Sequence, residues 1–259
     1  MCDSSSIYST RRIKVELPNR LSPDMISEAL FEMRFEHTDL SEMVTGRLST
    51  RLEAQGWKVS RLPAADLPEQ VRLTTPAMRF LPILEMRSAE GQEIIRVGPH
   101  VLSHHVVGDY MGWSVFQPKL LCSVNMALSA SQSIRPVRLG LRYMNAPTTI
   151  AHGIRSVHDL NLSITVAGSA PASDLQLIYR IVEDETLEGL VRIVTSSFIE
   201  ASPVPEAVAV VDIDMFTPDS TAHFEADNIA SWLEKAHDVE KRTFFGLLTP
   251  QTIATLKEQ

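Results

Sequence analysis

Two stretches of this chain alternate apolar and charged residues in the way that a half-buried strand requires. The first is 28–36, where the apolar side chains recur at every second position: Ala29, Phe31, Met33 and Phe35. The second is 137–143, with Val137, Leu139, Leu141 and Tyr143. Successive side chains of a strand point to opposite faces, so each stretch predicts a strand with one buried face. Each also carries an arginine, Arg34 or Arg142, between apolar neighbours.

Periodicity and turn residues predict the other elements. We expect helices at about 40–55, 113–130 and 226–248, strands at 80–87, 93–97, 101–107, 175–182, 189–198 and 207–216, and a last short helix after Thr249-Pro250. Asp39 and Glu42 form a capping-box pattern before the first helix. The proline-bearing stretch 57–78 is expected to be irregular. Segment 145–172 predicts only a short helix near 155–160 and a strand near 161–166.

These elements predict an α+β fold of antiparallel sheets with helices packed on one side. Each half follows a β-α-β-β-β-α order, with 23–131 as the first half and 132–259 as the second, after an N-terminal arm at 1–22. The two halves could also form one continuous domain. Arg34 and Arg142 lie 108 positions apart. Internal duplication and chance similarity both explain this offset.

Charge and composition exclude several classes of protein. The formal net charge is -8, which argues against generic coating of DNA. Nucleic acid remains a candidate partner only through the basic arm residues Arg11, Arg12 and Lys14. With two cysteines, no apolar run long enough to span a bilayer and no signal-peptide core, the expectation is a cytoplasmic protein without a membrane contact.

The histidines do not predict a metal site. His104 and His105 are neighbours on a predicted strand and therefore point to opposite faces. His100 and His104 share a face, but four strand residues separate them by roughly 13 Å, which is too far for one zinc ion. The sequence has no HExxH or CxxC motif. We expect no metal and no other cofactor.

The most chemically interesting residues are charged side chains on the non-core faces of two predicted strands. Asp212 and Asp214 share a face about 7 Å apart, a spacing that suits magnesium binding or acid–base chemistry. Arg138 and Arg142 share a face and could grip phosphate or carboxylate, with Arg34 on a neighbouring strand. The alternative is that these arginines pair with carboxylates across the sheet, namely Glu32, Glu36, Asp212 or Asp214.

Signals for nucleophilic catalysis or a phosphate loop are missing. The sequence has no G-x-S-x-G, no G-x-x-x-x-G-K-[ST] and no G-x-G-x-x-G. Cys122 lies in a predicted helix among apolar neighbours and is expected to be a buried, inert thiol. The sequence therefore offers no catalytic residues to name.

Four stretches of the chain resemble a family of roughly 250-residue proteins that occur sporadically in bacteria and archaea and have no established biochemical function. The stretches are Ser27–Phe35, Gly112–Phe116, Arg138–Asn145, and Val211–Asp214 with Trp232–His237 downstream. The family supplies no catalytic residues. Its patchy distribution implies accessory or mobile-element genes, and hence a role in phage defence or toxin control.

The sequence therefore predicts a non-enzymatic binding or regulatory protein that acts through a protein partner or through self-association. The alternative is a sensor or enzyme for a nucleotide or another phosphate ligand, bound on the polar sheet face at Arg34, Arg138, Arg142, Asp212 and Asp214.

Overall fold

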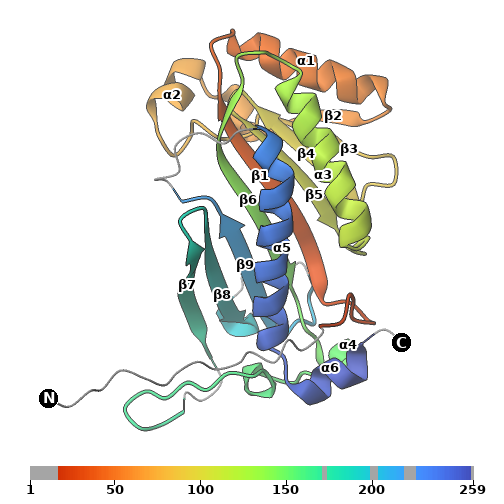
Figure 1. The fold of residues 1–259 in the computed structure, drawn as a ribbon, viewed down its shortest axis with the longest axis vertical. Helices are drawn as coiled ribbons and strands as arrows, with labels where there is room; N and C mark the ends of the chain where they lie inside the picture. Colours follow the sequence, from red (N-terminus) through yellow and green to blue (C-terminus); the bar gives the residue numbers. More distant parts are fainter. Residues whose placement is uncertain (1–16, 171–173, 199–203, 219–225, 258–259) are drawn as a thin grey trace, which may run out of the picture.

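A computed structural model describes residues 17–170, 174–198, 204–218 and 226–257 of the chain. Nine strands form one sheet in which every neighbouring pair is antiparallel, in the order β2-β3-β4-β5-β1-β6-β9-β8-β7 (Figure 1). The strands are β1 Ile26–Glu36, β2 Lys58–Arg61, β3 Leu84–Arg87, β4 Glu93–Gly98, β5 Val101–Val107, β6 Arg135–Asn145, β7 Gln176–Asp184, β8 Leu187–Thr195 and β9 Ala209–Phe216. The predicted α+β class with an antiparallel sheet is confirmed.

Helices cover one face of this sheet. Figure 1 shows α1, α3 and α5 on the same side, with α5 running across the centre of the sheet. The helices are α1 Ser41–Ala54, α2 Glu69–Thr74, α3 Trp113–Leu128, α4 Thr149–His152, α5 Ile229–Gly246 and α6 Pro250–Leu256. No helix within these described segments is both long and apolar enough to cross a bilayer.

The core lies between the sheet and these helices. The alternating residues of β1 behave as predicted: Phe31, Met33 and Phe35 are fully buried. On β6, Leu139, Leu141 and Tyr143 lie on the same side of the sheet. The intervening charged residues therefore project from the opposite face, which we call the polar face.

The two longest strands, β1 and β6, pair with each other at the centre of the sheet. Outward from β1 the order is β5, β4, β3, and outward from β6 it is β9, β8, β7. In each half the first strand is thus central and the last strand lies beside it, before the helix α3 or α5. One sheet runs through both halves, and duplication remains a prediction that this order supports.

Some local predictions are wrong. Helix α1 has Leu40 at its N-cap and no side-chain cap, because the Asp39 carboxylate instead accepts hydrogen bonds from Arg47 and Ser133. Stretch 57–78 is less irregular than expected, since it holds β2 and α2. In 161–166 there is no strand, only an isolated bridge from Val166 to Ser169.

The last helix begins as predicted. Thr249 is the N-cap of α6, and its hydroxyl accepts a hydrogen bond from the backbone N–H of Thr252. The basic arm residues Arg11, Arg12 and Lys14 lie outside the described residues.

Candidate functional site

The predicted site residues all lie on the polar face, and the structure brings them together across β1, β6 and β9. Arg142 sits opposite Asp214 in the register of β6 and β9, and Arg34 sits opposite Arg138 in that of β1 and β6. The question is whether these charges are available to a ligand or satisfied by one another.

Arg142 is satisfied by Asp212. Its Nε and Nη2 donate to the two carboxylate oxygens of Asp212 at 2.6 and 2.7 Å, a bidentate pair. This hydrogen bond raises the pKa of Arg142, against the opposing effect of burial. Arg192 of β8 approaches the same carboxylate at 3.8 Å. Asp212 is buried, so an incoming anion would have to displace it from Arg142.

Arg34 and Arg138 share one carboxylate. Glu32 Oε1 lies 2.7 Å from Arg34 Nε and 3.4 Å from Arg138 Nη1. The Arg138 guanidinium also lies over the ring of Phe216, at 5.0 Å from its centroid. Cross-strand ion pairing, one of the two interpretations of the sequence, therefore describes the geometry of Arg138 and Arg142.

Asp214 is the carboxylate of this group without a direct ion pair among the described residues. Burial raises its pKa to about 6, although Arg138 and Arg142 oppose the change. Gly140 of β6 lies next to it: a Cβ on this residue would be 3.4 Å from Arg138 Nη1 and 3.8 Å from Asp214 Oδ1, which is ordinary van der Waals contact.

The histidines follow the geometry expected of a strand. His105 is on the polar face, where its Nδ1 lies 2.7 Å from Glu28 Oε1, whereas His104 points to the helix side and contacts Ser123. Among the described residues, no group of three or more histidine, cysteine or acidic side chains is placed to hold a metal ion. Cys122 is exposed on α3, so the prediction of a buried thiol is wrong.

A second polar cluster joins β4, β5 and α3, beside a cavity of about 300 Å³ that Leu52 of α1 also lines. His104 Nδ1 is 2.8 Å from Ser123 Oγ, and its Nε2 is 3.3 Å from Glu93. The neighbouring imidazole and the ammonium of Lys119 lower the pKa of Glu93 to about 2. This order of groups resembles a catalytic triad. However, Ser123 lies in mid-helix, where backbone N–H groups are used by the helix and cannot form an oxyanion hole.

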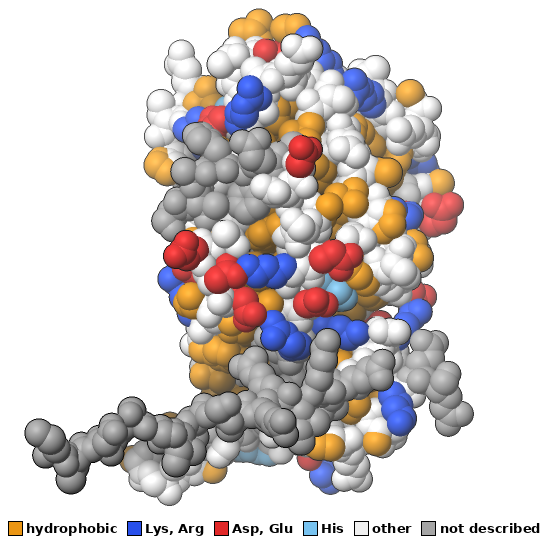
Figure 2. Space-filling view, in the orientation of Figure 1, with side chains coloured by type: hydrophobic (Ala, Val, Ile, Leu, Met, Phe, Trp, Pro, Cys, Tyr) orange, Lys and Arg blue, Asp and Glu red, His pale blue; other side chains and the backbone are white. Residues whose placement is uncertain are grey.

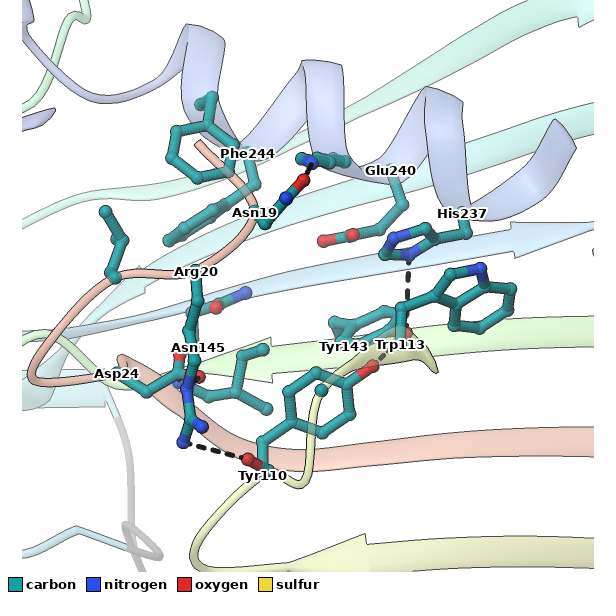
Figure 3. A pocket seen from close by; sticks show the side chains of 15 residues that line it. Asn19, Arg20, Asp24, Tyr110, Trp113, Tyr143, Asn145, His237, Glu240 and Phe244 are labelled. Carbon is teal, nitrogen blue, oxygen red and sulfur yellow. Dashed lines mark hydrogen bonds and ion pairs between the residues drawn. The ribbon is translucent and has the colours of Figure 1, made fainter. Parts of the chain in front are cut away.

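The most unusual group of side chains lies in a cavity of about 60 Å³ beneath α5 (Figure 3), which we call the α5 cavity. Its walls come from the segment 17–26, the loop before α3, strand β6 and helix α5. The residues that line it are Asn19, Arg20, Leu21, Asp24, Ile26, Tyr110, Gly112, Trp113, Tyr143, Asn145, His237, Glu240, Lys241, Phe244 and Phe245.

Each wall is held by contacts of its own. The segment 17–26 is anchored to α6 by a 2.6 Å hydrogen bond from the Ser22 N–H to the Leu256 carbonyl, and to the loop by Arg20, which donates to the Tyr110 carbonyl at 3.0 Å. Tyr143 reaches the cavity because it belongs to the buried face of β6. Glu240 reaches it from α5.

A short hydrogen-bonded chain crosses the cavity. The hydroxyls of Tyr110 and Tyr143 lie 3.0 Å apart, and the Tyr143 hydroxyl lies 3.5 Å from His237 Nδ1. Burial lowers the pKa of His237 to about 4, so the imidazole is neutral at pH 7. Its ring stacks on Trp113 at 4.1 Å between centroids. Burial also raises the pKa values of Tyr110 and Tyr143.

Two oxygen acceptors of the α5 cavity have no partner among the described residues. Glu240 is only 5% exposed, and its carboxyl group makes no hydrogen bond or ion pair with that part of the chain. Burial, with a smaller effect of Asp24, raises its pKa to about 8. Asn145 donates its amide N–H to the Val211 carbonyl, and its buried Oδ1 remains without a partner.

Sequence reasoning missed this cavity, although one signal was present. The buried positions of α5 recur at Ile229, Leu233, Ala236 and Phe244, and Glu240 lies on the same stripe. A carboxyl group on the buried face of an amphipathic helix costs free energy unless it is hydrogen-bonded or paired, so its presence marks a candidate site. The neighbours of Glu240 come from distant parts of the chain and could not be read from spacing.

The molecular surface on the helix side carries charges of both signs. Figure 2 shows acidic and basic side chains next to one another across the middle of this face. Helix α5 takes part in such pairs: Lys235 pairs with Asp184, and Arg242 pairs with Glu183 at 3.0 Å. The chain matches no protein-family model and no curated protein sequence.

Proposed function

We propose that the protein is a non-enzymatic binding or regulatory protein that acts through contacts with other protein chains. Strand β7 forms the contact, and a second copy of the same chain is its occupant. The observation that carries the proposal is the edge of the sheet. β7 is 9 residues long, and among the described residues its one neighbouring strand is β8, so within that part of the chain a row of its backbone N–H and C=O groups is open to another strand.

The side chains of β7 favour a partner strand. Ile178 and Val182 are exposed on the polar face, at 47% and 67%. Leu177, Tyr179 and Ile181 lie on the other face and are only partly buried. Natural sheets shield such edges with charges, prolines or very short strands, and the opposite edge strand, β2, has only 4 residues.

A second copy fits this edge because β7 is self-complementary. Antiparallel pairing about Arg180 places Ile178 opposite Val182 and Tyr179 opposite Ile181, which are favourable cross-strand pairs. The like-charge pair at the centre is compensated, since each Arg180 lies 3.2 Å from Glu188 of its own chain. Pairing of this kind would continue the sheet across two chains.

The molecular mass in solution tests this proposal. Size-exclusion chromatography with light scattering should give a dimer at micromolar concentration, and the double variant Ile178→Lys/Val182→Lys should give a monomer with an unchanged circular dichroism spectrum. Ile150→Lys is the matched control, because Ile150 is 85% exposed but lies on α4. A monomeric wild-type protein at about 100 µM, far above a micromolar Kd, would refute the role of β7.

The alternative, a phosphate ligand on the polar face, has one observation in its favour. Four arginines, at positions 34, 138, 142 and 192, lie there beside four carboxylates, Glu28, Glu32, Asp212 and Asp214. Clustered guanidinium groups bind phosphate well. Pyrophosphate or a nucleotide should then raise the melting temperature of the wild-type protein and not that of Arg142→Ala.

The biological setting rests on the sequence. Two cysteines and the family resemblance favour a cytoplasmic protein in a mobile-element, phage-defence or toxin–antitoxin context. Capture of the tagged protein from its host, followed by mass spectrometry, tests this setting separately from self-association.

A further inference from the structure

We propose that the α5 cavity is a binding site for a small organic cation, with an ammonium group that contacts Glu240 and Asn145. The site is distinct from strand β7, and it does not depend on the function proposed above.

Two oxygen acceptors of the cavity lack a donor in the described chain. The Oδ1 of Asn145 is fully buried without a partner, and the Glu240 side chain, 5% exposed, makes no hydrogen bond or ion pair there and accepts on both oxygens once it is ionised. The orientation of the Asn145 amide is settled by its N–H, which donates to the Val211 carbonyl. A buried acceptor without a donor costs about 1–3 kcal/mol, so the cavity favours a ligand rich in N–H groups.

The basic residues at the cavity do not supply these donors. Arg20 lies 3.6 Å from Asp24 and donates to the Tyr110 carbonyl, and Lys241 donates to Asn19 Oδ1 at 3.3 Å. His237 is neutral at pH 7, because burial lowers its pKa to about 4. A cation brought in by a ligand would therefore be the direct partner of Glu240.

The walls and the size of the cavity narrow the ligand further. Aromatic rings line it, those of Tyr110, Trp113, Tyr143, Phe244 and Phe245, and the faces of such rings attract ammonium groups. Figure 3 shows the Glu240 carboxyl group pointing away from α5 into the space among the labelled side chains. A volume of about 60 Å³ suits an ammonium head with a short alkyl group and excludes a nucleotide.

Binding of a cation would be coupled to ionisation of Glu240. With a pKa of about 8, most of the Glu240 population is protonated at pH 7, and an ammonium partner requires the charged form. Affinity should therefore rise between pH 6 and pH 8, and binding at pH 7 should release close to one proton. The other titratable groups at the cavity are Arg20, Asp24, Tyr110, Tyr143, His237 and Lys241. They are the same in all the variants compared below, so a difference between variants reports Glu240.

Ethylammonium chloride is the probe, titrated calorimetrically into the full chain at pH 7 in phosphate and in HEPES. We expect saturable binding with a Kd of about 1 mM, the affinity that so small a ligand can reach, and a buffer-dependent heat that reports the released proton. Ethanol and sodium acetate at the same concentrations should not bind. The indole N–H signal of Trp113, assigned with Trp113→Phe, should shift in NMR spectra because Trp113 lines the cavity.

Glu240→Gln keeps the shape of the side chain and should weaken ethylammonium at least tenfold. Asp238→Asn removes an exposed carboxylate from the same helix and should leave the Kd unchanged within twofold. Thermal unfolding of both variants shows whether they fold. The proposal is wrong if ethylammonium does not saturate the protein, if ethanol or acetate binds equally well, or if Glu240→Gln binds ethylammonium as tightly as wild type.

Discussion

Glu240 should make the protein less stable as the pH rises towards 8. Its pKa is about 8 in the folded chain, because of burial, against an ordinary value of 4.5. Between these values the folded state retains a proton that the unfolded state releases. The free energy of unfolding must then fall with increasing pH. Replacing Glu240 with glutamine, which does not titrate, should remove this dependence.

The size of the fall in unfolding free energy follows from the difference between the two pKa values of Glu240. Each pH unit between the two pKa values costs about 1.36 kcal/mol, so the whole interval from 4.5 to about 8 corresponds to about 5 kcal/mol as an upper limit. Asp214, with a pKa of about 6, and His237, whose pKa is about 4 in the folded chain, titrate mostly below pH 7 and do so equally in Glu240→Gln. The difference between wild type and Glu240→Gln from pH 6.5 to pH 8 therefore isolates Glu240, with an expected fall of about 2 kcal/mol.

Urea unfolding at half-unit steps from pH 6 to pH 8.5 measures this effect. Wild type and Asp238→Asn should lose stability in parallel, whereas Glu240→Gln should change little and should be the most stable of the three at pH 8. Parallel curves for wild type and Glu240→Gln would show that Glu240 is ionised in the folded protein, and the reasoning about its burial would be refuted.

Three further predictions concern the sheet and a helix end, and equilibrium urea unfolding at pH 7 measures each of them. Gly98→Ala should lower the free energy of unfolding by about 2 kcal/mol, because the new Cβ would lie 2.5 Å from the Leu81 carbonyl oxygen, a backbone atom that cannot move aside. Thr249→Ala should cost about 1 kcal/mol through loss of the α6 cap. Asp212→Ala should cost about 2 kcal/mol, since the Arg142 guanidinium it leaves is partly exposed, and adding Arg142→Ala should then cost little more.

The sequence predicted the elements whose apolar side chains recur at a regular spacing. In these elements one force, the burial of apolar side chains on one face, determines the structure. Burial of one face places Phe31 and Leu141 where period two puts them. The predicted cap at Asp39 is wrong because its carboxylate forms an ion pair with Arg47 instead. A local sequence pattern contains no information about partners that only the folded chain brings close.

The same limit applies to the sites. Which residues share the polar face follows from strand parity, so Arg142 and Asp212 could be placed near each other from the sequence. Whether they pair depends on the register between β6 and β9, which no local pattern contains. For the α5 cavity, the sequence does not show even which residues lie next to one another. Asp24, Asn145 and Glu240 come from three separate parts of the chain.

Adjacent residues of β6 show how this sheet separates structural charges from a candidate binding site. Arg142 points to the polar face and is held by Asp212 in a bidentate pair, whereas Tyr143 points beneath α5 into the cavity that contains the unpaired Glu240. A paired charge gains little from a new ligand, because the ligand must first break the pair. The carboxyl group of Glu240 has no pair to break, so an ammonium ligand gains the interaction less only the cost of ionising Glu240. Ethylammonium should therefore stabilise the protein more than pyrophosphate does, and the reverse order would place the binding site on the polar face.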